Sequence, residues 1–317
     1  MRLSIAAAVY NGERFLLEQL ESYARQSRLP DELVISDNAS TDGSVEIIRE
    51  FARRVPFPVC LLINERNLGV SKNFEKAIYK CTGDIIFLSD CDDVWYPDKL
   101  ALMEKAFVRW PGVAVATCDA DLVDEALRPL GRTLWQKEGH RYSTRARELM
   151  ATGRMFRVFP PGQGCCMAFR GKFKHLVLPL PVGDPPPVWH DVFILWTIVL
   201  SGAGRFLPVS ETLQAYRQHE HQLAGAKGTE LSTRILRRKC RPPFGPFLER
   251  MESPIAAQFT KDPALRQAVL RHWRARWHLP ESRIVRTPIV LKELISGRYH
   301  RFSHGFAAAA KDLLFVL

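Results

Sequence analysis

The clearest chemical signal in the sequence lies at residues 90–93, where Asp90, Asp92 and Asp93 occupy three of four positions. Carboxylates this close repel one another unless a cation is present. A hard divalent ion, held by one or two carboxylates while it bridges substrate phosphates, is the usual solution. We therefore predict a site for Mg²⁺ or Mn²⁺ at this segment. The alternative is a solvated acidic turn that caps the next helix.

The elements that must position these aspartates alternate between two periodicities. Short, nearly all-apolar runs are typical of strands buried on both faces, and apolar residues at three- and four-residue spacing are typical of amphipathic helices. The expected strands are residues 3–9, 33–36, 59–63 and 84–89, and the expected helices are 13–24, 44–52, 71–79 and one after Pro97. This alternation predicts an α/β fold with a mostly parallel sheet flanked by helices.

Polar residues follow each predicted strand, where open parallel sheets bind their ligands. Tyr10 and Asn11 follow the first strand, Asp37 the second, Asn67 the third and the aspartates the fourth. No Gly-x-Gly-x-x-Gly follows the first strand, and no glycine-rich loop carries Gly-Lys-Ser/Thr. The pattern therefore argues against a dinucleotide enzyme and against a P-loop nucleotide hydrolase.

Composition restricts the class of protein further. The chain has 317 residues, 46% of them hydrophobic and 25% charged, as in an ordinary globular protein. Seven cysteines, with no Cys-x-x-Cys pair, indicate neither a disulfide framework nor a zinc ribbon and fit a reducing compartment. The apolar run 192–200 is far shorter than the roughly 20 residues that cross a bilayer. We expect a soluble or peripheral protein.

Several segments together resemble a known family. They are Ile5–Gly12, Val34–Gly43, Asn67–Gly69 and Ser89–Trp95, followed by Gly164–Phe169, His190–Asp191 and Tyr216–His219. The first four are similar in order and spacing to family 2 glycosyltransferases of the GT-A fold, and the later three resemble the bacterial rhamnosyltransferase-like branch. The resemblance covers about residues 1–225 and implies a nucleotide-sugar donor, a divalent metal and inversion at the anomeric carbon.

The resemblance also implies which residues bind the donor. Tyr10 and Asn11 would line the base pocket, and Asp37 would accept a hydrogen bond from the base, because a fixed carboxylate recognises an imide N–H well. Asn67 is expected at the same donor site. For Asp37 the alternative is a turn residue that, with neighbouring Ser and Gly residues, opens the next helix.

The implied metal ligands come from two distant segments. Asp92 would ligate the metal, Asp90 would contact the metal or hold the ribose, and Asp93 completes the acidic group. His219 resembles a position where GT-A enzymes place a further metal ligand, with a neutral imidazole beside the carboxylates. The alternative for His219 is a histidine that is merely hydrogen-bonded.

Asp191 is the expected catalytic residue. It precedes the apolar run 192–200, a pattern that predicts a helix start where the positive end of the helix dipole faces the carboxylate. Inverting transfer needs one base that takes the proton from the acceptor hydroxyl, and a lone carboxylate suffices. The alternative is an ordinary helix cap.

The acceptor is expected to contact Gly164, Trp189 and His190. Residues 160–164 form a turn-rich lead into an apolar strand at 165–169, where bulky side chains would block the site. Cys165 and Cys166 are interpreted as core residues, because adjacent cysteines lack chelating geometry.

The net charge of +11 is confined to the last third of the chain. After residue 226 there are 18 Lys and Arg against 7 Asp and Glu, which leaves 27 of each sign before it. We therefore predict a GT-A domain at 1–225, with a nucleotide-sugar-binding half at 1–110 and an acceptor half at 111–225. Residues 226–317 are predicted to form a basic, mainly helical region.

This basic region has three interpretations. Cations cluster at 234–241, aromatic and cationic residues interleave at 272–278 around Trp273 and Trp277, and residues 302–317 favour an amphipathic helix. We favour binding to an anionic membrane surface, where Trp and Arg suit the headgroup layer. A nucleic acid partner is not expected, and a solvated helical face is the remaining alternative.

We therefore expect an inverting, metal-dependent glycosyltransferase of bacterial surface polysaccharide synthesis, cytoplasmic and peripheral on the inner face of the cytoplasmic membrane. Its partners would be a nucleoside diphosphate sugar, with dTDP-rhamnose favoured by the branch and UDP-hexoses left open, and a glycan or polyprenyl-linked saccharide acceptor. One alternative is a sugar-1-phosphate nucleotidyltransferase, although its glycine-rich phosphate loop is missing. The other is a non-catalytic nucleotide-sugar or carbohydrate-binding protein with the same fold.

Overall fold

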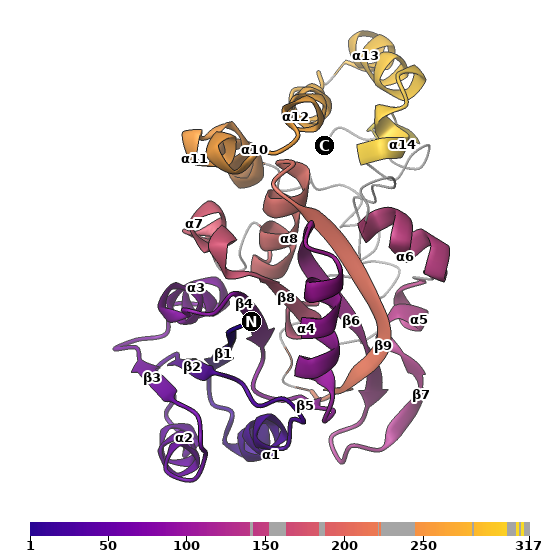
Figure 1. The fold of residues 1–317 in the computed structure, drawn as a ribbon. Helices are drawn as coiled ribbons and strands as arrows, with labels where there is room; N and C mark the ends of the chain where they lie inside the picture. Colours follow the sequence, from indigo (N-terminus) through magenta and orange to yellow (C-terminus); the bar gives the residue numbers. More distant parts are fainter. Residues whose placement is uncertain are drawn as a thin grey trace.

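The computed structural model describes residues 1–139, 142–151, 163–183, 188–220, 222, 245–280, 282–302, 309–310 and 312–313. In these residues nine strands form one sheet in the order β3-β2-β1-β4-β8-β6-β9-β5, with β7 paired to β6 (Figure 1). Helices cover both faces of the sheet, so the predicted α/β class is confirmed.

The first half of the sheet is parallel. Strand β1 pairs in parallel with β2 and β4, and β2 pairs in parallel with β3. The strands are β1 (Leu3–Val9), β2 (Glu32–Asp37), β3 (Val59–Ile63) and β4 (Ile85–Ser89), and the helices between and after them are α1 (Glu13–Ala24), α2 (Ser44–Ala52), α3 (Val70–Lys80) and α4 (Lys99–Arg109). The predicted alternation of strands and helices over residues 3–109 is therefore confirmed, with bounds that differ by one or two residues.

Strand β1 shows why these runs are apolar at nearly every position. Leu3, Ile5 and Val9 pack into one core cluster together with residues of α1, α2 and α4. Ala6, between them in sequence, packs into a second cluster with residues of α3 and α8. Because successive side chains of a strand point to opposite faces, a strand covered on both faces must be apolar throughout.

The second half of the sheet is mixed. Strand β8 runs antiparallel to both β4 and β6, whereas β9 runs parallel to β6 and antiparallel to β5. The strands are β5 (Val94–Trp95), β6 (Val113–Val123), β7 (Pro129–Thr133), β8 (Met167–Arg170) and β9 (Arg205–Arg217), and the helices are α5 (Leu134–Glu138), α6 (Thr144–Ala151), α7 (Lys174–Val177) and α8 (His190–Leu200).

One strand prediction in this half is wrong in its bounds. The strand expected at 165–169 begins at Met167, because Gly164–Cys166 form a short 3₁₀ turn. The Cys166 N–H donates to the Gln163 carbonyl at 3.0 Å and closes this turn. This turn takes Cys165 out of the strand. Its carbonyl oxygen can therefore accept a hydrogen bond from another element.

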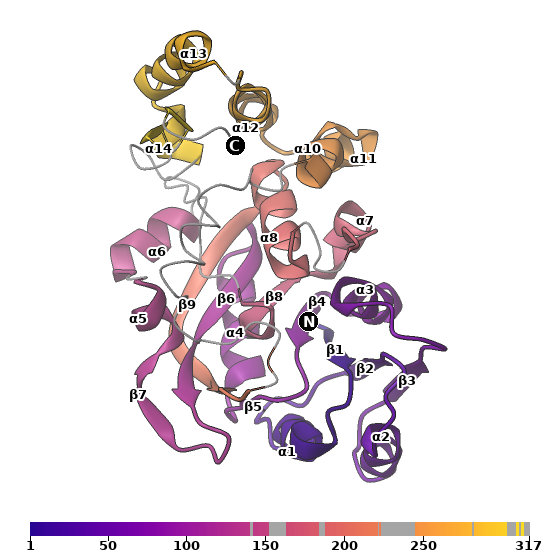
Figure 2. The same cartoon turned by 180° about the vertical axis from the view of Figure 1, so that it is seen from behind.

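The C-terminal region is helical, as predicted, and packs on α8 (Figures 1 and 2). Its helices are α10 (Gly245–Glu252), α11 (Pro254–Phe259), α12 (Pro263–Trp277), α13 (Arg283–Ile295) and α14 (Arg298–Phe302). Trp273 of α12 is fully buried, with its ring centroid 5.5 Å from that of Trp196 in α8 and 6.0 Å from that of Phe247 in α10. The expectation that Trp273 lies in a membrane headgroup layer is therefore wrong, because the ring fills the interface between these helices.

Two basic residues of α12 also face inward. His272 contacts Glu293 at 2.7 Å, and the Arg276 guanidinium bonds both carboxylate oxygens of Asp312, at 2.6 and 2.9 Å. The cation-rich segment 272–278 is thus partly an internal ion-pair network, which corrects its interpretation as a binding surface. The predicted cluster of Arg234, Arg237, Arg238, Lys239 and Arg241, and the residues Phe306, Leu314 and Val316 of the last predicted helix, lie outside the described residues. No helix of the described part of the chain is both long and apolar enough to span a bilayer.

Candidate active site

Loops at the carboxyl ends of β1, β2 and β4 lie together along one edge of the sheet. Val9 of β1 is paired with Asp37 of β2, and Ala7 of β1 is paired with Ser89 of β4. The loops that follow these strands therefore start side by side. In this way the structure brings Tyr10 and Asn11 to the same edge as Asp37 and the aspartates at 90–93.

Asp37 organises the turn before α2. It is fully buried, and its carboxylate accepts hydrogen bonds from the Ser40 backbone N–H at 2.9 Å and the Ser40 hydroxyl at 2.5 Å. Asn11 joins this turn, because its N–H donates to Ser40 Oγ at 2.9 Å and its Oδ1 accepts the Thr41 N–H at 2.9 Å. The geometry is that of the turn residue considered as the alternative, and contact of Asp37 with a nucleobase stays a prediction. Tyr10, beside it, is 47% exposed.

A network of asparagines supports this edge, and only Asn67 among them was a predicted site residue. The Asn38 amide donates to Asn67 Oδ1 at 2.8 Å, and Asn38 Oδ1 accepts the Leu68 N–H at 2.8 Å. The Asn64 amide donates to Asn73 Oδ1 at 3.0 Å, and the Asn73 amide donates to the Val9 carbonyl at 3.2 Å. The carboxamide oxygen of Asn67 is thus engaged inside the protein. The sequence signal for the network is Asn73, a polar residue on the buried face of α3.

The aspartate turn joins β4 to β5, with Asp90 and Asp92 partly buried. Asp93 is fully buried and accepts hydrogen bonds from the Gln214 side-chain amide and from the Arg217 backbone N–H, each at 3.1 Å. Potential ligand atoms of Asp90, Asp93 and Cys165 all lie within 4.8 Å of one another. Cys165 was predicted as a core residue, and it is buried, but its thiol also borders the predicted metal site.

The electrostatics of this turn agree with a cation site. Burial, followed by the charges of Asp92 and Asp191, raises the pKa of Asp90 to about 7. Burial and the charges of Asp92 and Asp90 raise the pKa of Asp93 well above its usual range. Both shifts arise chiefly from burial and then from repulsion between neighbouring carboxylates, and a bound divalent cation would oppose them. The residues present therefore fit Mg²⁺ or Mn²⁺.

The side chain of Asp92 contacts His219, the predicted metal ligand that comes from a distant segment of the chain. His219 Nε2 lies 2.9 Å from Asp92 Oδ2, and the His219 ring packs 5.0 Å from the Phe15 ring. His219 Nδ1 is buried and has no hydrogen-bond partner among the described residues. The Asp92 carbonyl accepts a hydrogen bond from Arg217 Nε at 2.7 Å, so β9 fixes the backbone of the turn as well. The structure thus brings all four predicted metal ligands to one region, in two adjacent groups.

Lys99, which sequence reasoning missed, is a fully buried cation beneath the aspartates. Its ammonium group donates to the Cys165 carbonyl at 2.7 Å and to the Gln214 side-chain oxygen, and it lies 3.9 Å from the centroid of the Trp95 ring. Gln214 in turn donates to Asp93. Lys99 therefore connects α4, the Gly164–Cys166 turn and β9, and its charge lowers the pKa of Asp90.

The first turn of α8 carries the predicted base. Asp191 is 8% exposed, and burial raises its pKa to about 6, although backbone hydrogen bonds from Val192 and Gly164 act in the opposite direction. The Val192 N–H donates to Asp191 Oδ1 at 2.7 Å. A carboxylate with a pKa near 6 is ionised at neutral pH and is a better proton acceptor than an exposed aspartate.

The three predicted acceptor residues surround Asp191. His190 is buried and stacks on Phe74 of α3 with ring centroids 4.0 Å apart, and burial lowers its pKa to about 3. Neither of its ring nitrogens has a hydrogen-bond partner among the described residues. Gly164 cannot carry a side chain here, because a Cβ would lie 2.8 Å from His190 Nε2. Trp189 precedes the helix and is 36% exposed.

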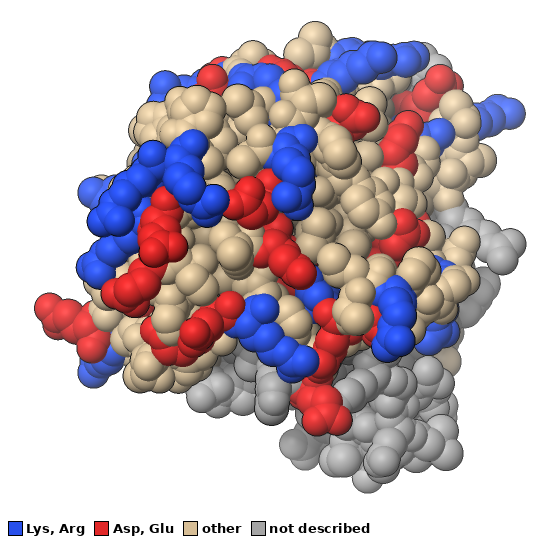
Figure 3. Space-filling view, turned by 90° about the horizontal axis from the view of Figure 1, so that it is seen from below, with Lys and Arg blue, Asp and Glu red and all other residues tan. Residues whose placement is uncertain are grey.

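A hollow of about 560 Å³ lies beside the Asp92–His219 pair. It is lined by Arg14, Phe15 and Glu18 of α1, by residues 124–126 and Arg128 of the β6–β7 connection, and by Arg217 and Gln218. Its arginines are paired with acids, as in Arg14 with Glu125 and Arg217 with Glu18. Seen from below, cationic and anionic side chains are interspersed over the surface (Figure 3).

Comparison with known sequences gives a consistent result. The family model described as "Glycosyl transferase family 2" matches residues 4–176. An uncharacterized glycosyltransferase of Nostoc is 28% identical over 222 residues, 69% of this chain and 65% of that protein. A dTDP-rhamnosyl transferase of Shigella flexneri is 37% identical over 97 residues, 29% of this chain and 34% of that protein. The chain thus spans between about a third and about two thirds of the length of these relatives.

Comparison with solved structures shows the same fold. TarS of Staphylococcus aureus in complex with UDP-GlcNAc matches with a TM-score of 0.54 and 17% identity, over 99% of this chain and 82% of that one. A mannosyltransferase of Pyrobaculum calidifontis in complex with GDP-mannose and Mn²⁺ matches with a TM-score of 0.51 and 19% identity, over 99% of this chain and 87% of that one. At this level of identity the likeness concerns the fold.

Replacement of Lys99 tests its positioning role. Lys99→Met should lower the free energy of unfolding by about 3 kcal/mol, because it removes one partner of a buried charged network and leaves the others unsatisfied. Lys105→Met, at an exposed position of the same helix, is the matched control and should change stability by less than about 0.5 kcal/mol. Urea denaturation followed by circular dichroism measures both. Equal free energies of unfolding for the two variants would show that Lys99 does not stabilise the contacts between α4, the Gly164–Cys166 turn and β9.

Proposed function

We propose that this chain, which belongs to glycosyl transferase family 2 and has the GT-A fold, is a glycosyltransferase that moves a sugar from a nucleoside diphosphate to an acceptor hydroxyl with inversion at the anomeric carbon. The observation that carries this proposal is the proximity of Asp191 to the aspartate turn. Gly164 lies against Asp191, since a Cβ there would be 3.5 Å from Asp191 Cβ, and the thiol of the next residue, Cys165, lies within 4.8 Å of ligand atoms of Asp90 and Asp93. We therefore propose that a base and a phosphate-binding turn face the same space.

In the proposed mechanism Asp191 accepts the proton of the acceptor hydroxyl while that oxygen attacks the anomeric carbon. The bond to the diphosphate breaks on the opposite side, so one displacement inverts the configuration. The neutral His190 ring and Gly164 border the carboxylate of Asp191, and His190 has free ring nitrogens to bond the acceptor's other hydroxyl groups. The burial that raises the pKa of Asp191 also limits competing water.

We propose that Asp90, Asp92 and His219 hold Mg²⁺ or Mn²⁺. When bound, the metal neutralises the charge that develops on the leaving diphosphate. Asp93 is less available as a metal ligand, because its carboxylate accepts hydrogen bonds from Gln214 and Arg217. Asp93 therefore fixes the turn, and Asp92 and His219, whose side chains lie 2.9 Å apart, would supply ligand atoms to the ion. The Mn²⁺ in the structure of the Pyrobaculum mannosyltransferase supports this assignment.

The donor is proposed to lie across the loops after β1 and β2, with its base near Tyr10, Asn11, Asp37 and Asn67. The similarity to a dTDP-rhamnosyl transferase supports dTDP-rhamnose as the first donor to test. UDP-hexoses come second, because a structural neighbour is solved with UDP-GlcNAc. The acceptor is proposed to be a growing glycan of a bacterial surface polysaccharide, free or polyprenyl-linked.

The last part of the proposal is peripheral attachment to the inner face of the cytoplasmic membrane. Its support is the excess of 11 positive charges after residue 226. Because Trp273 and Arg276 are buried in the helical region, we assign contact with the membrane to the cations at 234–241.

Asp191→Asn should retain donor binding and lose transfer by a factor of about 10² to 10⁴, as expected for loss of a general base. In the parent, turnover should fall as the pH drops through about 6, because protonated Asp191 cannot accept a proton. Turnover at saturating donor and acceptor, measured across this pH range, gives both results. Asp98→Asn, at an exposed site before α4, is the control. Unchanged turnover in Asp191→Asn would show that Asp191 is only a helix cap.

Metal dependence is tested by calorimetry with dTDP and UDP. Both should bind much more weakly in excess EDTA than with Mn²⁺, because the aspartates otherwise face the phosphates without a cation. Asp92→Asn should lose most of the Mn²⁺-dependent gain and keep the thermal stability of the parent, whereas Asp98→Asn should keep the gain. Equal affinities with and without metal would remove the metal from this mechanism.

Membrane attachment is tested by sedimentation with anionic vesicles. Reversal of Arg237, Arg238 and Lys239 to Glu should release the protein, because each basic residue near a charged leaflet contributes about 1 kcal/mol. The interaction should also weaken steeply with added salt. If the reversed variant pellets as well as the parent at low salt, the positive charge of this region serves another purpose.

A further inference from the structure

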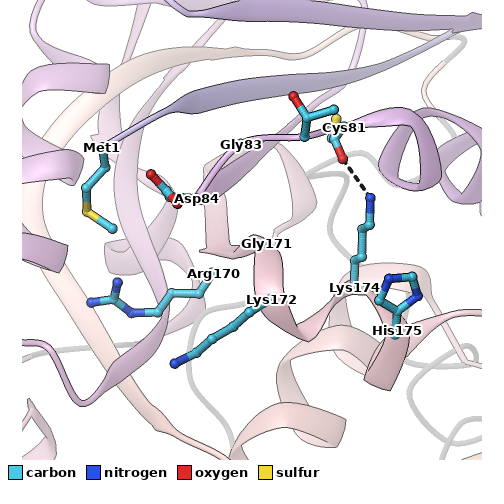
Figure 4. A pocket seen from close by; sticks show the side chains of 10 residues that line it. Met1, Cys81, Gly83, Asp84, Arg170, Gly171, Lys172, Lys174 and His175 are labelled. Atoms are coloured by element: carbon cyan, nitrogen blue, oxygen red, sulfur yellow. Dashed lines mark hydrogen bonds between the residues drawn. The ribbon is translucent and has the colours of Figure 1, made fainter.

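A second hollow lies at the opposite edge of the sheet from the active site (Figure 4). It has a volume of about 370 Å³ and is lined by the residues that enter β4 and by those that leave β8. Because β4 has five residues and a strand rises about 3.3 Å per residue, the hollow is about 15 Å from the aspartate turn. It is therefore separate from the donor site.

The floor of this hollow is made of backbone. A Cβ on Gly171 would lie 2.1 Å from the Gly83 carbonyl oxygen, and a Cβ on Gly83 would lie 2.4 Å from Ser4 Oγ. These two positions therefore admit only glycine, which lets the start of β4 and the end of β8 approach each other closely. No side chain projects from either residue to fill the space above them.

The walls are strongly cationic. Arg170, Lys172, Lys174 and His175 line the hollow, and Asp84 is the acidic residue among the described lining. Arg170 donates to the backbone carbonyls of Val113 and Phe107, at 2.7 and 2.8 Å, and Lys174 donates to those of Cys81 and Tyr79, at 2.8 and 3.1 Å. These carbonyls orient the side chains without cancelling their charge.

Lys172 has no ion-pair or hydrogen-bond partner among the described residues, and it extends to the same side as Arg170 (Figure 4). Burial, followed by the charges of Lys261 and Arg170, lowers its pKa. Elsewhere in the described chain arginines commonly meet carboxylates, as Arg28 meets Asp31 and Arg298 meets Glu293. Here Arg170, Lys172 and Lys174 line one concave surface, with Lys174 directed toward the Cys81 carbonyl (Figure 4), and an anion stabilises such a surplus of positive charge.

We propose that this hollow is a binding site for a phosphate group, separate from catalysis. A dianionic phosphate matches the surplus positive charge, and ammonium and guanidinium groups are its usual donors. The volume of 370 Å³ accommodates a diphosphate or a small phosphorylated molecule. The phosphate belongs either to a soluble molecule or to a lipid headgroup. The site does not depend on the proposed transferase mechanism.

Calorimetry with inorganic pyrophosphate in excess EDTA tests the site, because metal-dependent binding at the aspartates is then suppressed. Lys172→Glu should weaken binding by about tenfold or more, and Lys172→Gln by a smaller factor, since the first change reverses the charge and the second only removes it. Lys105→Glu, exposed on α4 and outside the hollow, should bind like the parent. Thermal denaturation verifies that all variants are folded.

A parallel arm uses phosphatidylcholine vesicles with and without phosphatidic acid. Loss of pyrophosphate binding in Lys172→Glu supports a soluble phosphate ligand. Loss of binding to phosphatidic acid vesicles in the same variant, with no pyrophosphate binding by the parent, supports a lipid headgroup. If Lys172→Glu and Lys105→Glu match the parent with both probes, the proposal is overturned. Both arms measure binding and neither measures turnover. The result therefore stays valid even if the proposed glycosyltransferase function fails its own tests.

Discussion

Negative charge buried at the edge of the sheet is the constraint on which the rest of the site depends. Asp90 lies within reach of the charges of Asp92 and Asp191, and Asp93 within reach of those of Asp92 and Asp90; the pKa values of Asp90, Asp93 and Asp191 are all raised. An uncompensated buried charge costs several kcal/mol, so the fold must supply donors to such groups. Lys99 supplies a cation, and Gln214 and the Arg217 N–H supply hydrogen bonds. These contacts in turn fix where β9 and the Gly164–Cys166 turn lie.

Local sequence patterns predicted much of this architecture but few of the long-range side-chain contacts within it. The strands and helices of residues 3–109 follow from periodicity, and the aspartate turn and Asp191 follow from residue type and position. Lys99 could not be found in this way, because it reads as one exposed lysine of an amphipathic helix and its partner Gln214 is 115 residues away. Trp273 was misplaced for a related reason. An aromatic residue among arginines resembles a membrane-facing residue until the partners Trp196 and Phe247 are known.

Helix α8 connects the catalytic edge with the C-terminal region. Its first turn carries His190 and Asp191, and its later turns present Trp196 and Leu200 to the cluster around Trp273. A helix is stiff along its axis, so the packing of α10 and α12 against one end bears on the placement of the carboxylate at the other. The helical region is therefore part of the structure that positions Asp191, whatever else its surface binds.

The two-residue strand β5 has a consequence for how the protein is made. Val94 and Trp95 pair with Ala215 and Gln214, so the segment after the aspartate turn finds its strand partner more than a hundred residues later. At a synthesis rate of about 5–20 residues per second, the ribosome releases that partner on the order of ten seconds after β5. For the earlier part of this interval, until β8 is made, β4 also lacks its neighbour on one side. The nascent amino-terminal half therefore emerges with an open apolar edge, and a gene fragment that stops before β9 is expected to yield an aggregating polypeptide instead of a smaller folded domain.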